Sequence, residues 1–111
     1  MNIHEQKQGA VTVIKPEGPL VEEDLPMFRG RIEEIRRVSV GRFVLDCSAV
    51  PFVDSRGLET LVEISERMSQ VGQSLRVCGV NETLREVLDI TELSSMFEHY
   101  DDVHGAVRSF L

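Results

Sequence analysis

Apolar residues recur along this chain with two periods, one typical of strands and one typical of helices. Short apolar runs bounded by turn residues predict strands over residues 11–15, 42–46, 75–80 and 96–100, with a weaker edge strand over 3–8. Apolar residues at spacings of three and four predict four helices between and after these strands. The helices carry Leu25, Phe28, Ile32 and Ile35; Leu58, Leu61, Val62, Ser65 and Met68; Leu84, Val87 and Leu88; and Val103, Ala106, Val107 and Phe110.

Residue types typical of helix ends flank these patterns. Asp24 and Pro26 indicate one helix start, Asn81 is a predicted N-terminal cap, and another helix is expected to start at Asp101 or Asp102. Gly72 is predicted to end the helix that starts at Ser55. Short connections between alternating strands and helices predict right-handed parallel crossovers. A turn after residue 8 would add an antiparallel strand at the N-terminal edge, so the sheet is expected to be mixed.

The chain has 111 residues and is predicted to be one α/β domain over residues 1–111. Hydrophobic residues make up 41% of the chain, but no apolar run is long enough to span a membrane. We also expect that the chain does not begin with a signal sequence. We therefore expect a cytoplasmic protein that does not insert into membranes. A formal net charge of −7 argues against nucleic-acid binding, which requires a basic surface.

One stretch of the chain is rich in arginine although the chain as a whole is acidic. Arginines and glutamates are interleaved there and predict a solvated helix face with charge pairs. The residues are Arg29, Arg31, Glu33, Glu34, Arg36, Arg37 and Arg42. The two cysteines, Cys47 and Cys78, lack zinc-site spacing and are expected to be buried, reduced thiols, close together if their strands are neighbours.

The stretch VPFVDSRG, residues 50–57, combines an acidic and a hydroxyl residue where a strand gives way to a helix. Asp54 and Ser55 are both favoured caps, because a side-chain oxygen can accept a free N–H of the first turn. The same free N–H groups and the helix dipole would also favour a phosphate on Ser55. The residues alone leave both interpretations open.

Other chemistries find little support in the sequence. A serine hydrolase would need a base near Ser55 and usually a G-x-S-x-G elbow, but Val53 stands two positions before the serine. His4, His99 and His104 lie near the termini. No phosphate-binding loop motif occurs, and the acidic residues lack the spacing of a calcium loop. We therefore predict no catalytic residue, no metal and no cofactor.

An apolar strand followed by Asp-Ser-x-Gly-Leu at a helix start resembles the signature of the STAS domain, the sulfate-transporter and anti-sigma-factor-antagonist family. GAVTVIKPEGPL (residues 9–20) resembles that family's early strand, and GQSLRVCGVNETLREVLDITEL (residues 72–93) resembles its later glycine, strand and helix. The resemblance covers nearly the whole chain. It implies a mixed, mostly parallel sheet with about four helices packed largely on one face.

The resemblance also implies a function. In stand-alone bacterial antagonists the serine after the aspartate accepts the phosphate, which maps onto Ser55. The unphosphorylated protein would bind an anti-sigma factor that is also a GHKL-type serine kinase, and so free a sigma factor. Phosphorylation would release that partner, and a PP2C-type phosphatase would reset the switch. Asp54, Ser55, Arg56 and Gly57 would form the partner-binding site, with Gly57 permitting close approach by the partner's backbone.

Two positions depart from the family pattern. Arg56 replaces the Ser, Thr or Ala that commonly follows the phosphoacceptor, and could either pair with the phosphate or alter kinase docking. Pro19 and Val21 stand where the early turn usually carries acidic residues.

Small STAS proteins also resemble subunits of lipid-transport ABC complexes and scaffolds of stress-signalling assemblies, in which Ser55 would be only a cap. The sequence leaves this alternative open, together with the question of a homodimer.

Overall fold

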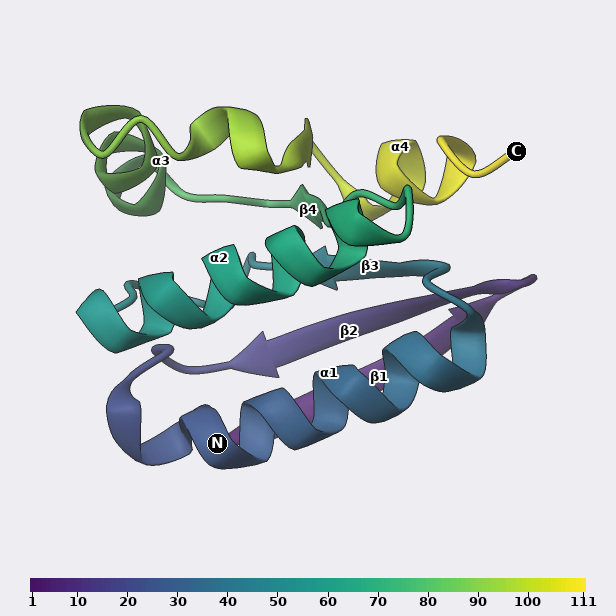
Figure 1. Cartoon of the computed structure of the whole chain (residues 1–111), viewed down its shortest axis with the longest axis horizontal. Helices are drawn as coiled ribbons and strands as arrows, with labels where there is room; N and C mark the ends of the chain where they lie inside the picture. Colours follow the sequence, from purple (N-terminus) through teal and green to yellow (C-terminus); the bar gives the residue numbers. More distant parts are fainter.

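The computed structural model describes residues 1–111 as a five-stranded sheet flanked by helices (Figure 1). The strands are β1 (Asn2–Gln8), β2 (Val11–Glu17), β3 (Phe43–Asp46), β4 (Arg76–Cys78) and β5 (Glu98–Tyr100). They lie side by side in chain order. β1 is antiparallel to β2 and every other pair is parallel, which confirms the predicted mixed sheet.

The four predicted helices are all present. They are α1 (Leu25–Ser39), α2 (Ser55–Gln70), α3 (Glu82–Ile90) and α4 (Val103–Arg108). Two short 3-10 turns, η1 (Glu22–Asp24) and η2 (Ser94–Met96), precede α1 and β5. None of the helices combines the length and the apolar composition that crossing a bilayer would require.

Three strands are shorter than predicted, β3 only because it begins at Phe43 and not at residue 42. The strand expected over residues 75–80 is limited to Arg76–Cys78, because Gly79 turns the chain with a φ of +66°. The strand expected over residues 96–100 is limited to Glu98–Tyr100, because Met96 closes η2. Leu75 and Phe97 are buried in the core but lie outside the strands. Their apolar side chains therefore made both strands look longer in the sequence than they are.

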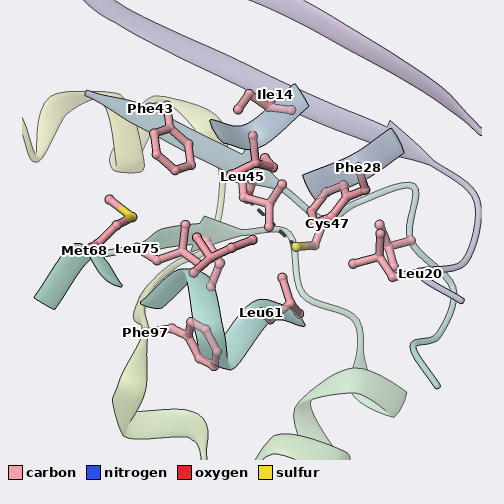
Figure 2. Packing of buried hydrophobic residues seen from close by; sticks show 14 of the residues in the cluster. Ile14, Leu20, Phe28, Phe43, Leu45, Cys47, Leu61, Met68, Leu75 and Phe97 are labelled. Carbon is pink, nitrogen blue, oxygen red and sulfur yellow. Dashed lines mark hydrogen bonds between the residues drawn. The ribbon is translucent and has the colours of Figure 1, made fainter. Parts of the chain in front are cut away.

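The core lies on both faces of the sheet but is unequally divided. A cluster of 18 buried residues packs α1, α2 and α3 against one face, and Figure 2 shows Phe28 of α1 and Leu61 and Met68 of α2 within it. On the other face, Val11, Val44 and Cys78 pack against Ala106 of α4. Three helices therefore cover one face and only α4 covers the other, as the expected arrangement largely on one face implies.

Three predicted helix starts are confirmed, with Asp24, Asn81 and Asp102 at the N-terminal cap positions of α1, α3 and α4. Asn81 Oδ1 accepts the Leu84 N–H at 2.8 Å, and Asp102 Oδ1 accepts the Gly105 N–H at 2.8 Å. Asp24 stands at the start of α1 as predicted, with Pro26 in the first turn, but its side chain makes no capping hydrogen bond. The turn η1 leads directly into α1, and Asp24 Oδ1 lies 3.6 Å from the amino group of Met1 instead.

The predicted charge pairs of α1 are present, and some also tie α1 to α2. Arg36 pairs with Glu33 at 2.8 Å within α1, and Arg67 of α2 reaches the same glutamate at 3.4 Å. The hydrogen bond from Arg36 is the main cause that lowers the pKa of Glu33 below its ordinary value. Arg29 of α1 reaches α2 as well, donating to Thr60 Oγ1 at 3.0 Å. These arginines therefore belong to a helix–helix contact as well as to a solvated face.

The two cysteines lie at adjoining strand ends and are free thiols. The Cys47 N–H donates to the Cys78 carbonyl at 2.8 Å, so the predicted proximity of the two residues is correct. Burial raises the pKa of each thiol to about 12. Neither is therefore a thiolate at neutral pH, and neither is an activated nucleophile.

Candidate functional site at the start of helix α2

Asp54 fixes the start of α2 and ties it to the loop before α1. Its Oδ1 accepts the Gly57 N–H at 2.7 Å, which makes Asp54 the N-terminal cap. Its Oδ2 accepts the Glu22 N–H at 3.0 Å. The backbone hydrogen bonds from Gly57 and then Glu22 hold the pKa of Asp54 below its ordinary value. One ionised carboxylate thus joins two segments that lie far apart in the sequence.

The backbone around Leu20 reinforces this junction. Leu20 forms a parallel bridge with Val53, and its carbonyl accepts the Asp54 N–H at 3.1 Å. A Cβ atom added to Gly57 would overlap that same carbonyl oxygen. The close approach that we expected Gly57 to offer a partner is therefore occupied by the chain itself, and Gly57 is buried.

Ser55 and Arg56 are the exposed members of the predicted site. Ser55 is the first residue of α2, so its hydroxyl stands beside N–H groups that have no partner within the helix. The Arg56 guanidinium extends to Glu59, with 3.5 Å between Nη1 and Oε2. Asp54, Ser55 and Arg56 therefore share a surface at the helix start, and Gly57 lies beneath it.

A groove runs from Ser55 along α2, and sequence reasoning did not find it. It has a volume of about 620 Å³ and is lined by Ser55, Leu58, Glu59, Val62, Glu63 and Leu93. Leu58 packs against the core and also lines this groove. Helical spacing from Ser55 would have indicated Glu59, Val62 and Glu63 as neighbours. Leu93 comes from the segment after α3, which no local pattern could have placed there.

The three histidines lie on β1, β5 and α4. His4 of β1 pairs with Glu17 of β2, and His99 Nε2 lies 2.8 Å from the Ser94 carbonyl oxygen. His104 belongs to α4, which packs against the opposite face of the sheet from α2. The structure also gathers no group of three or more His, Cys, Asp or Glu side chains able to hold a metal ion. The arrangement at Ser55 is that of an accessible hydroxyl at a helix start, without a neighbouring histidine.

Comparison with known proteins places this architecture in a family. The model of the STAS domain matches residues 2–106, nearly the whole chain. The chain belongs to the STAS domain family. Among its relatives is a protein of Paenibacillus polymyxa named anti-sigma F factor antagonist, 26% identical over 108 residues, which cover 96% of this chain and 92% of that protein.

Solved STAS structures have the same fold. The crystal structure of the protein TM1081 from Thermotoga maritima matches with a TM-score of 0.87 at 23% identity, covering 96% of this chain and 92% of that one. The unphosphorylated form of the anti-sigma factor antagonist SpoIIAA matches with a TM-score of 0.73 at 14% identity, covering 98% and 96%. At these identities the likeness concerns the fold, which agrees with the predicted STAS-like arrangement of sheet and helices.

Proposed function

We propose that this STAS domain is an anti-sigma factor antagonist that is switched off by phosphorylation of Ser55. The observation that carries the proposal is the exposed Ser55 hydroxyl on the first residue of α2, held in place by the doubly bonded Asp54 cap. The relative from Paenibacillus polymyxa named anti-sigma F factor antagonist supports the assignment of the partner class. The unphosphorylated domain binds an anti-sigma factor and thereby frees a sigma factor.

The fold of the domain can accept a phosphate at this position. The positive end of the α2 helix dipole stabilises an anion at this position, beside the Asp54 carboxylate that already accepts the Gly57 N–H. The phosphate adds about 1.5 to 2 negative charges and three acceptor oxygens. A partner packed over Ser55 would lose its contact through repulsion and desolvation while the domain stays folded.

Two partners complete the proposed cycle. The anti-sigma factor is also the serine kinase, and it supplies the ATP and magnesium, whereas this chain supplies only the hydroxyl. A PP2C-type phosphatase removes the phosphate and restores binding. In this role the domain is a regulatory binding module and not a catalyst.

The test uses the anti-sigma factor encoded in the same genome, incubated with ATP and with the wild-type chain, Ser55→Ala or Ser55→Asp. We expect phosphate uptake by the wild type and none by Ser55→Ala, measured by intact-mass spectrometry. Ser55→Asp should bind the partner at least about tenfold more weakly than Ser55→Ala, because a charge at the contact replaces a small neutral group. Ser69→Ala, which removes another exposed serine of α2, is the matched control and should behave as the wild type.

The alternative is static docking, as in a transport complex or a signalling scaffold. If the wild type takes up no phosphate and both Ser55 variants bind the partner equally well, the switch is wrong and static docking takes its place.

A further inference from the structure

The first turn of α2 carries an arginine whose present partner belongs to the groove beside Ser55. Arg56 lies 3.5 Å from Glu59, and their side chains are 63% and 61% exposed. Glu59 lines the groove together with Ser55. An ion pair this exposed contributes little to stability, so its cation can change partner at small cost.

Helix geometry places Glu59 between Ser55 and Arg56. With 3.6 residues per turn, Glu59 lies about 40° and Arg56 about 100° around the helix from Ser55. The Arg56 side chain, in reaching Glu59, already bends toward the side of the helix that carries Ser55. Glu59 lies about 6 Å farther along the helix axis than Ser55, so the long, exposed Arg56 side chain would reach a phosphate on Ser55 by swinging back toward the helix start.

A phosphate is also the stronger partner for that guanidinium. It carries nearly two charges at neutral pH, against one for Glu59. Its oxygens accept paired N–H donors from arginine, which makes charge-assisted bidentate bonds. Both effects favour transfer of Arg56 to the phosphate.

Once Arg56 moves to the phosphate, no other arginine of the groove is free to pair with Glu59. Glu63 is paired with Arg29 at 3.2 Å, and Arg29 is fixed by its hydrogen bonds to the buried Thr60. Arg29 is thus committed to its own partners and does not replace Arg56 at Glu59. In the unphosphorylated chain each groove carboxylate is neutralised by one arginine.

We infer that phosphorylation of Ser55 transfers Arg56 from Glu59 to the phosphate and leaves an unpaired Glu59 carboxylate on a groove that otherwise receives an apolar side chain of the anti-sigma factor. The apolar nature of this occupant follows from Leu58, Val62 and Leu93, which line the groove. It follows equally from the internal pairing of both carboxylates. The inference rests on the proposed function for the identity of the partner, but the exchange of Arg56 can be tested without one.

The first experiment installs phosphoserine at position 55 during protein synthesis, so that no kinase is required. The pKa of the phosphate, near 6 in free phosphoserine, is then measured by ³¹P NMR. We expect Arg56→Ala to raise this pKa by about 0.5, because the guanidinium stabilises the dianion. Arg67→Ala is the matched control, since Arg67 is on the same helix, is 62% exposed and pairs with a glutamate at 3.4 Å. An equal phosphate pKa in Arg56→Ala and wild type would overturn the exchange.

The second experiment measures the affinity of the anti-sigma factor for both forms by calorimetry. In the phosphorylated form, Glu59→Gln should bind about twofold to fivefold more tightly than the wild type, because the uncovered carboxylate is gone. In the unphosphorylated form the same change should matter less than about twofold. Glu66→Gln, an exposed carboxylate of α2 outside the groove, is the control.

The two experiments separate the two ways of failing. If the anti-sigma factor binds neither form, the proposed function and the docking part of the inference fail together, whereas the titration still decides the exchange. If the factor binds but Glu59→Gln leaves the affinity of the phosphorylated form unchanged, only the role of the groove is overturned.

Discussion

Helices α2 and α4 begin with the same four-residue pattern, yet they differ in what that pattern does. Asp54-Ser55-Arg56-Gly57 opens α2 and Asp102-Val103-His104-Gly105 opens α4. In both, the aspartate accepts the N–H of the glycine, at 2.7 Å in α2 and 2.8 Å in α4. The local capping chemistry is therefore the same at the two helix starts.

The two helix starts differ in the segments that pack around them. At α2 the loop before α1 packs onto the cap, so that Asp54 also bonds Glu22 and Gly57 meets the Leu20 carbonyl. At α4 a Cβ on Gly105 would meet only Asp102 Oδ1 at 3.4 Å and Tyr100 at 3.9 Å, ordinary contact distances. A cap motif thus fixes where a helix starts, whereas distant segments decide whether its glycine can be replaced.

The largest expected difference concerns the two glycines. Gly57→Ala should lower the free energy of unfolding by about 3 kcal/mol, because the methyl group overlaps a backbone atom that cannot move alone. Gly105→Ala should range from neutral to about 1 kcal/mol stabilising, because alanine is the better helix former. Urea denaturation monitored by circular dichroism measures both. Equal losses at the two positions would show that the contact with Leu20 does not distinguish the helices.

A smaller difference is expected for the two caps. Asp102→Ala should cost about 1 kcal/mol, a usual value for loss of an N-terminal cap. Asp54→Ala should cost more, because the Glu22 N–H loses its acceptor as well. Asp102→Asn, which keeps the one acceptor oxygen in use, should recover most of its loss in the same denaturation assay. Asp54→Asn should recover only part, because one amide oxygen replaces two carboxylate oxygens that both accept N–H groups. A larger loss of stability in Asp102→Ala than in Asp54→Ala would contradict the added role of the Glu22 contact.

The smallest effect is a pH dependence specific to Asp54. Its pKa in the folded chain lies below the ordinary 3.8, so the carboxylate stabilises the fold fully above that value. This contribution is lost as the pH falls through the lower folded pKa. The stability gap between wild type and Asp54→Asn should therefore be constant near neutral pH and close in acid below about pH 4. Glu33, whose pKa is also lowered, is present in both proteins and cancels. A gap that does not narrow at all between neutral pH and pH 2 would contradict the role of the Asp54 charge.

The sequence predicted those features that depend on neighbours along the chain. The order of strands and helices follows from apolar spacing, and the caps at Asp54, Asn81 and Asp102 follow from the ability of short polar side chains to accept a first-turn N–H. Ser55 was placed at the helix start for the same reason. Asp24 and Pro26 likewise indicate the start of α1, where η1 leads into the helix without a side-chain cap.

The features that the sequence could not predict depend on segments brought together by folding. The carbonyl of Leu20 over Gly57 comes from the β2–α1 connection, and Leu93 enters the groove from beyond α3. No periodicity relates these positions to α2. The same limit applies to Gly57, since a glycine in the sequence permits a close approach without indicating which backbone makes it.

The junction between Leu20 and Gly57 also bears on how such a chain can diverge. Ser55 and Gly57 stand two positions apart, but one is an exposed side chain and the other is enclosed by its own backbone. A descendant that no longer needed a phosphate could replace the serine without disturbing its fold, whereas it would have to keep the glycine. In an alignment of STAS sequences, the glycine would therefore report shared architecture, and only the hydroxyl two residues earlier would report shared regulation.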